Sequence, residues 1–129
     1  MRYIILCFFA LGSLAAAQQP SAPSPTSGFS FRTSANEFLR MCEPLSGKTP
    51  ELKQSCILYV VGIADGAYVQ EMKQSGSRPY RIPNTVQFEQ EYRVAVKYMN
   101  DHPEETHLPT PRLVIEAIAA AFPYQGDKP

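Results

Sequence analysis

The stretch of residues 49–72 limits what this 129-residue chain can fold into more than any other part of it. Its centre, CILYVVGIA at 56–64, is almost entirely apolar and rich in β-branched residues, so a buried strand and a buried helix both fit it. The preceding TPE at 49–51 supplies a capping hydroxyl, a first-turn proline and an acid, as helix starts do. The apolar positions then recur at intervals of three and four over more than the length of a strand. We therefore predict a central, surrounded helix, with Gly62 where another helix crosses closely.

Helix-start signals elsewhere predict three further helices. A capping box at 34–37 begins the first, which ends near Pro44. The residues NTVQ at 84–87 have the same pattern, so the third helix is expected to start at position 84 or 85. Thr110 acts as the cap of the fourth, which Pro123 ends. No strand and no internal repeat are indicated, and the expected fold is all-α, a small domain resembling a four-helix bundle.

The composition divides the chain into four parts. Residues 1–17 have the basic start, apolar run and small-residue end of a secretory signal peptide, with cleavage expected after Ala17. Residues 18–32 are a flexible leader rich in proline and serine, 33–124 form the domain, and 125–129 are a tail. The apolar run is too short for a membrane anchor, so we expect a soluble periplasmic or secreted protein.

The charge balance limits the partners. The chain has 12 basic and 12 acidic residues, so its formal net charge is +0. Nucleic acid and anionic membranes are recognised through a basic surplus. Neither is therefore expected as a partner, and no membrane association is predicted.

Cys42 and Cys56 remain after removal of the signal peptide. In an exported small domain such a pair most often forms a disulfide, which over this loop should stabilise the fold by about 3 kcal/mol. Two free buried thiols are the alternative. A metal site would need more ligands than two cysteines supply.

The sequence HPEETH at 102–107 brackets two acids with two imidazoles, and a metal-dependent hydrolase is one interpretation. Zinc-hydrolase helices place two histidines four residues apart, whereas His102 and His107 are five apart, which turns the rings about 140° from each other. Pro103 also forces His102 out of helical geometry. We therefore expect helix-end structure at both histidines.

Asp65 lies within the most apolar segment and could act as a general base. A partly exposed or hydrogen-bonded acid is the favoured interpretation. There is no serine-nucleophile elbow and no phosphate-binding glycine loop, so no cofactor is expected and a binding module is favoured over an enzyme.

Four segments together resemble the Rap/Tai immunity family associated with type VI secretion. They are FLRMC at 38–42, CILYVVGIADG at 56–66, RIPNTVQFEQEYRVAVKYMNDHPE at 81–104 and TPRLVIEAIAAAFPY at 110–124. The resemblance implies an exported, all-α, disulfide-bonded protein that binds a peptidoglycan amidase effector and obstructs its active cleft. Relatives are often dimers, so a homodimer is a further possibility. The resemblance also places Cys42 and Cys56 at the positions of the family's first disulfide.

Two positions depart from the family pattern, because Arg81 and Tyr124 stand where it has a second pair of cysteines. The missing tether between the 73–83 loop and the end of the fourth helix could cost about 2–5 kcal/mol, unless Tyr124 packs on the Arg81 stem or stacks with its guanidinium. The same loop is expected to be exposed. Tyr80 and Arg81, residue types that anchor interfaces, are therefore the candidate partner-binding residues.

Three hypotheses follow. The leading one is a non-enzymatic exported protein that inhibits a cell-wall amidase by occlusion. The second is a small periplasmic acid-stress chaperone. The third is a hydrolase that uses His102, His107 and Asp65.

Overall fold

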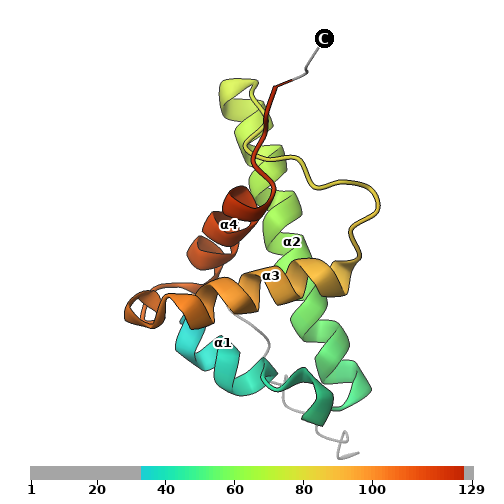
Figure 1. Ribbon diagram of the computed structural model, residues 1–129, viewed down its shortest axis with the longest axis vertical. Coiled ribbons are helices and arrows are strands. Elements are labelled where there is room, and N and C mark those ends of the chain that lie inside the picture. Colours follow the sequence, from blue (N-terminus) through green and yellow to red (C-terminus); the bar gives the residue numbers. More distant parts are fainter. Residues whose placement is uncertain (1–32, 127–129) are drawn as a thin grey trace, which may run out of the picture.

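The computed structural model describes residues 33–126, so the predicted signal peptide, the predicted leader and residues 127–129 of the predicted tail lie outside the described residues. Within them the chain forms four α-helices and two short 3-10 turns (Figure 1). The elements are α1 Ala35–Cys42, η1 Leu45–Gly47, α2 Pro50–Ser75, α3 Phe88–Asp101, η2 Pro103–Glu105 and α4 Thr110–Ala121. No strand occurs among these residues, and the predicted all-α fold is confirmed.

Local capping explains where the first two helices begin. At α1, the Glu37 N–H donates to the Ser34 hydroxyl over 3.3 Å, and the Ser34 N–H donates to the Glu37 carboxylate over 3.0 Å. At α2, the Leu52 N–H donates to the Thr49 hydroxyl over 3.3 Å. Each cap satisfies backbone donors that have no partner within the helix. The predicted starts of both helices are therefore confirmed.

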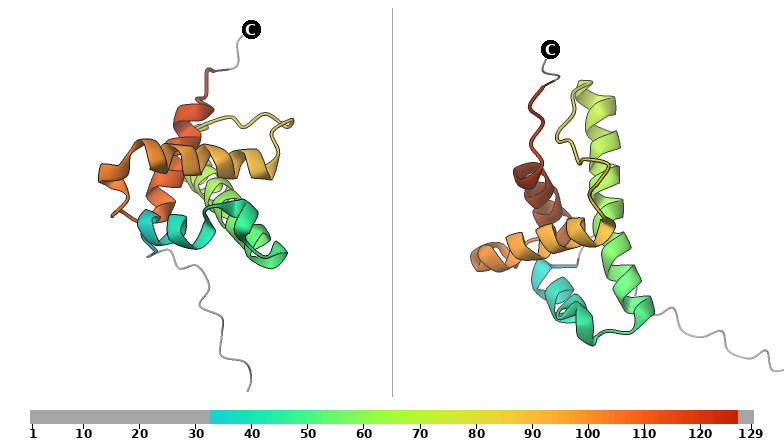
Figure 2. Two further views of the ribbon diagram at one scale, coloured as in Figure 1. Left: turned by 60° about the horizontal axis from the view of Figure 1, so that its bottom comes forward. Right: turned by 45° about the vertical axis from the view of Figure 1, so that its right-hand side comes forward.

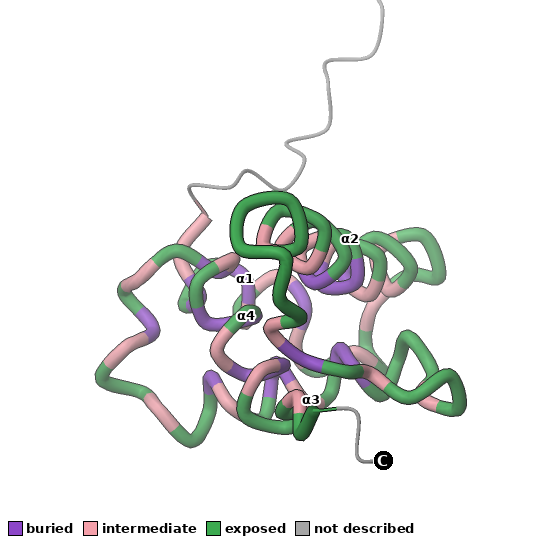
Figure 3. Tube along the Cα trace, turned by 90° about the horizontal axis from the view of Figure 1, so that it is seen from above, coloured by how far each residue is buried: buried purple, intermediate pink, exposed green. Residues whose placement is uncertain are grey.

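Helix α2 is the longest element and the others pack around one side of it. Helix α3 runs across α2, and α4 packs against both (Figure 2). Helix α1 contacts α2 and α4. The buried residues of α2 face these helices, whereas its opposite face is exposed (Figure 3). None of the helices in residues 33–126 combines the length and apolarity that crossing a bilayer needs.

The core joins all four helices and includes the disulfide. Its buried side chains are mainly Phe38, Cys42, Cys56, Val60, Ala64, Tyr92, Met99, Leu113, Val114 and Ile118. The predicted disulfide is confirmed: Cys42 at the end of α1 is bonded to Cys56 in α2, with both side chains fully buried. Tyr92 of α3 reaches the same place, where its hydroxyl donates to the Glu43 carboxylate over 2.7 Å.

Two predicted helix starts were wrong. Helix α3 begins at Phe88 and not at 84 or 85, because the Val86 N–H donates to the Pro83 carbonyl and closes a turn first. Thr110 is not the cap of α4 but its first helical residue. Its hydroxyl and its N–H both donate to the Thr33 carbonyl over 2.8 Å, so this threonine ties the fourth helix to the start of the domain.

The expectation for Gly62 was also wrong. It lies on the outer face of α2, and no heavy atom of another segment comes within 4 Å of the position that a Cβ would occupy. No helix therefore crosses there. Leu58 and Val69 on the same helix expose about half of their side-chain surface, 46% and 50%. Nothing in the structure explains the glycine.

Candidate partner-binding surface

The segment that leads from α2 to α3, called here the 76–87 loop, begins at a sharp turn. Gly76 has a φ of +69°, a left-handed conformation that any residue with a side chain adopts only with strain. Its N–H donates to the Met72 carbonyl and closes the helix, as helix-ending glycines do. The chain therefore turns back and runs beside α2 (Figure 1).

Tyr80 fixes the loop to the body of the protein. Its side chain is only 2% exposed, and its hydroxyl donates to the Ala64 carbonyl in α2. Its ring lies 6.0 Å from the ring of Tyr68. Burial, with a smaller contribution from the Asp65 carboxylate, raises the pKa of Tyr80 to about 12. The ring is therefore not at the surface, where the sequence analysis expected it, and its role in partner binding stays a prediction.

The loop is also attached to the end of α4. Tyr80 and Pro123 form an isolated antiparallel bridge, and the Arg81 N–H donates to the Phe122 carbonyl over 2.9 Å. The guanidinium of Arg78 lies 5.9 Å from the centre of the Tyr124 ring, a cation–π contact that is worth about 0.5–1 kcal/mol at an exposed site. These contacts connect the two segments between which the sequence analysis expected a missing tether. That Arg81 and Tyr124 stand at the positions of a second cysteine pair stays a prediction.

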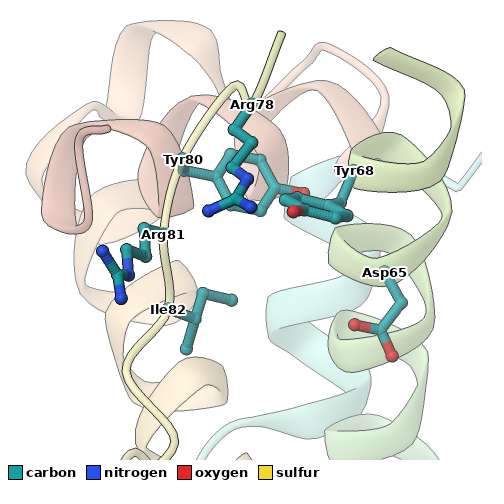
Figure 4. Close-up of a pocket in the computed structure, with 6 residues that line it drawn as sticks. All are labelled: Asp65, Tyr68, Arg78, Tyr80, Arg81 and Ile82. Carbon is teal, nitrogen blue, oxygen red and sulfur yellow. The ribbon is translucent and has the colours of Figure 1, made fainter. Parts of the chain in front are cut away.

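A small cavity of about 210 Å³ opens between this loop and α2 (Figure 4). Arg81 and Arg78 are exposed on the loop side, and the exposed Asp65 stands on the α2 side. The residues that line the cavity are Asp65, Tyr68, Arg78, Tyr80, Arg81 and Ile82. Sequence analysis named Arg81 but missed Arg78, because the pairing of this loop with α2 is a tertiary contact that no local pattern shows.

A second hollow region lies between α2 and α3, and the segment 43–46 that follows α1 borders it. Two grooves of about 560 and 520 Å³ share Ile57 and Glu89 in their linings. Phe88 lines one of them and is 55% exposed, more than any other large hydrophobic residue between positions 33 and 126. The Arg93 guanidinium lies 2.5 Å from Glu89 and places charge at the edge of the same region.

Glu91 of α3 is a buried acid that the sequence analysis did not single out. It is 5% exposed, and its Oε2 atom has no hydrogen-bond partner in the protein. Burial raises the pKa of Glu91, and the nearby Asp65 carboxylate raises it further. Its spacing relative to Phe88, Tyr92 and Ala95 could have shown that it shares their helix face.

Replacing Glu91 by glutamine should stabilise the protein at neutral pH. The pKa of Glu91 is higher in the folded protein than its ordinary value of 4.5, so the folded state binds the proton more tightly than the unfolded state. Ionisation of Glu91 therefore destabilises the fold as the pH rises from 4.5 through the folded pKa. We expect Glu91→Gln to have a higher Tm than the wild type at pH 7.5, and this advantage should vanish below pH 4.5.

Thermal unfolding at pH 4 and pH 7.5 measures both differences. Glu89→Gln is the matched control, because this neighbouring acid is 51% exposed and should show no such pH-dependent gain. A Glu91→Gln variant with equal or lower Tm at pH 7.5 would contradict the argument.

The two histidines lie at helix-end and turn positions, as predicted. His102 caps the C-terminus of α3, with its N–H donating to the Tyr98 carbonyl and its ring centre 4.3 Å from that of Tyr98. In His107, Nδ1 lies 2.9 Å from the Glu104 carbonyl oxygen. Within the described part of the chain, no three His, Cys, Asp or Glu side chains gather as a metal-binding group.

In the described residues, the fold is a small helical domain with one disulfide, and its surface has a cavity beside the 76–87 loop and grooves between α2 and α3. The model of the family described as Rap1a immunity proteins matches residues 34–124, and the chain belongs to this family. The match runs from the cap of α1 to Tyr124 and confirms the resemblance seen in the sequence. Family membership implies a protein that binds an effector. No curated protein and no solved structure matches the chain.

Proposed function

We propose that this chain is a non-enzymatic immunity protein that binds a peptidoglycan amidase effector and blocks its active cleft. The observation that carries the proposal is the family match, which covers α1 to α4 in one piece. Blocking a cleft needs a rigid surface of matching shape and no reactive group. The 76–87 loop supports this proposal, since hydrogen bonds at Tyr80 and Arg81 attach it to α2 and to the end of α4.

We further propose that the protein acts in the periplasm or outside the cell. The buried Cys42–Cys56 disulfide supports this location, because disulfides persist in oxidising compartments and are rare in the cytosol. The signal peptide expected at residues 1–17 would direct the chain there. An effector that attacks peptidoglycan would be met in the same compartment.

For the partner-binding residues, we propose that Arg81 contacts the effector directly. Its side chain is exposed at the rim of the cavity, whereas Tyr80 is buried beneath it. Tyr80 would then act by holding the loop in place. Arginine is among the residues that most often dominate interface energetics.

Co-purification tests the proposal. The tagged protein, produced without residues 1–17, is mixed in turn with each exported hydrolase encoded near it, and with an unrelated exported hydrolase as control. We expect a stable complex with a peptidoglycan amidase among them and none with the control, with a Kd at or below about 10 nM, as tight inhibitory complexes show. The elution volume of the free protein in the same run shows whether it is a homodimer.

The absence of a complex with every exported hydrolase encoded nearby would contradict the proposal. Suppression of client aggregation below about pH 3, where most carboxylates are protonated, would then favour the acid-stress chaperone instead.

A further inference from the structure

One side of α2 is left uncovered by the rest of residues 33–126. In the right-hand view of Figure 2 the helix runs along an edge of the domain, and Figure 3 shows its outer side exposed. Six exposed residues follow this side with the period of the helix and lie within about 40° of one line along it. They are called here the α2 stripe and are Glu51, Leu58, Gly62, Gly66, Val69 and Lys73.

The centre of the α2 stripe is apolar and open to close approach. Leu58 and Val69 are both strongly exposed. Between them lie Gly62 and Gly66, and no heavy atom of another segment comes within 4 Å of the Cβ position of either. Glycine inside a helix lowers the stability of that helix relative to alanine, and it allows a second backbone to approach closely. The two glycines therefore suit a helix that packs on this side from outside the chain.

The ends of the α2 stripe carry opposite charges. Glu51 lies in the first turn of the helix and Lys73 in the last. No ion pair within residues 33–126 uses either side chain. The two residues are equally far from Gly62 in the chain, and so are Leu58 and Gly66. The stripe is therefore complementary to a reversed copy of itself.

An antiparallel second copy makes use of this symmetry. With a two-fold axis at Gly62, each Glu51 faces the second copy's Lys73. Each Leu58 faces the space above the second copy's Gly66. A two-fold interface repeats every such contact twice, and antiparallel helices place each positive helix start beside a negative helix end. A parallel copy would instead set like charges against each other at both ends.

We propose that the α2 stripe is a self-association surface, on which two copies of this chain pack antiparallel with Gly62 at the two-fold axis. Each copy contributes one helix, so the buried area lies near or below the roughly 1,200 Å² at the low end of stable interfaces. A reversible dimer with a Kd of about 1–100 µM is therefore expected. None of the stripe residues lines the cavity or the two grooves, so the surface is separate from them.

Sedimentation equilibrium of the protein without residues 1–17 measures the Kd of the dimer, and no effector is needed. Gly62→Glu should weaken the dimer by at least about 20-fold, because two carboxylates would meet at the axis and hold the helices apart. The open Cβ position means that this glutamate meets no other segment of its own chain. Circular dichroism of each variant confirms that it is folded.

Charge reversal tests the antiparallel arrangement and leaves Gly62 in place. Glu51→Lys and Lys73→Glu should each weaken the dimer by about 3- to 20-fold, because each change turns two ion pairs into repulsive contacts. The double variant restores both pairs with their charges exchanged, and its Kd should return to within about 3-fold of the wild type. Arg40→Glu makes the same charge change as Lys73→Glu on the exposed surface of α1 and should alter the Kd by less than about 2-fold.

A wild type that stays monomeric up to about 500 µM, well above the expected Kd, would overturn the inference. A dimer that Gly62→Glu leaves intact, or a double charge variant no tighter than the single ones, would overturn it as well. A monomeric wild type whose amidase complex is lost in Gly62→Glu would mean that the effector occupies the α2 stripe in place of a second copy. Failure to bind any amidase counts against the proposed function alone, because self-association is measured without one.

Discussion

Replacing Cys42 and Cys56 together by alanine should lower the free energy of unfolding by about 3 kcal/mol, within a range of about 2–5 kcal/mol. The two cysteines are 14 positions apart, and their disulfide restricts the unfolded chain and joins α1 to α2. Both side chains are fully buried, so the loss of the sulfur atoms adds a packing defect. For a domain of this size the Tm should fall by about 10–25 °C.

Urea unfolding of the double variant and the wild type measures this difference. The wild type under a reductant that opens the disulfide is the second comparison, because it removes the cross-link while keeping both sulfur atoms. We expect the free energy of unfolding of the reduced wild type to lie between those of the oxidised wild type and the double variant. An unchanged unfolding midpoint in the double variant would show that the disulfide does not support the fold.

Replacing Tyr80 by alanine should lower the free energy of unfolding by about 3–5 kcal/mol, the usual loss for a large buried aromatic side chain. The ring is almost wholly buried and contacts the ring of Tyr68, and the hydroxyl donates a hydrogen bond to the Ala64 carbonyl. Its removal should also free the loop from the end of α4. The Arg81 amide, which is bonded to Phe122, should then exchange its hydrogen much faster than in the wild type.

Tyr80→Phe is the matched control for this change. It keeps the ring and removes only the hydroxyl, so we expect a loss of about 0.5–1.5 kcal/mol and slow exchange at Arg81. Hydrogen exchange and urea unfolding of both variants give the comparison. A Tyr80→Ala variant as stable as the wild type, with slow exchange at Arg81, would show that this side chain does not hold the loop.

The helices could be predicted where their signals are local. The capping box at Ser34 and the cap at Thr49 involve residues three positions apart in the chain, and both were found from the sequence. Thr110 was predicted to be a cap from a local signal as well, the proline that follows it. In the structure its hydroxyl instead bonds to Thr33, far away in the sequence, and no local pattern contains that contact.

The candidate surface was predicted only in part, because it depends on contacts between distant segments. The turn residues correctly indicated a long loop, but not that Tyr80 would fold back onto α2. Arg78 lines the same cavity as Asp65 of α2, and only the packing of the loop on α2 brings these two residues together. The prediction for Gly62 was wrong because the close helix crossing that was expected at this residue does not form within the chain.

Inhibition of peptidoglycan cleavage tests the central claim most directly. The purified protein is titrated into a fixed concentration of the amidase with which it co-purifies, and the release of peptide from peptidoglycan is measured. If the protein acts by occupying the active cleft, cleavage should fall in proportion to the amount added and cease near one chain per enzyme. Full amidase activity in the presence of excess protein, or peptide release by the protein alone, would contradict the account.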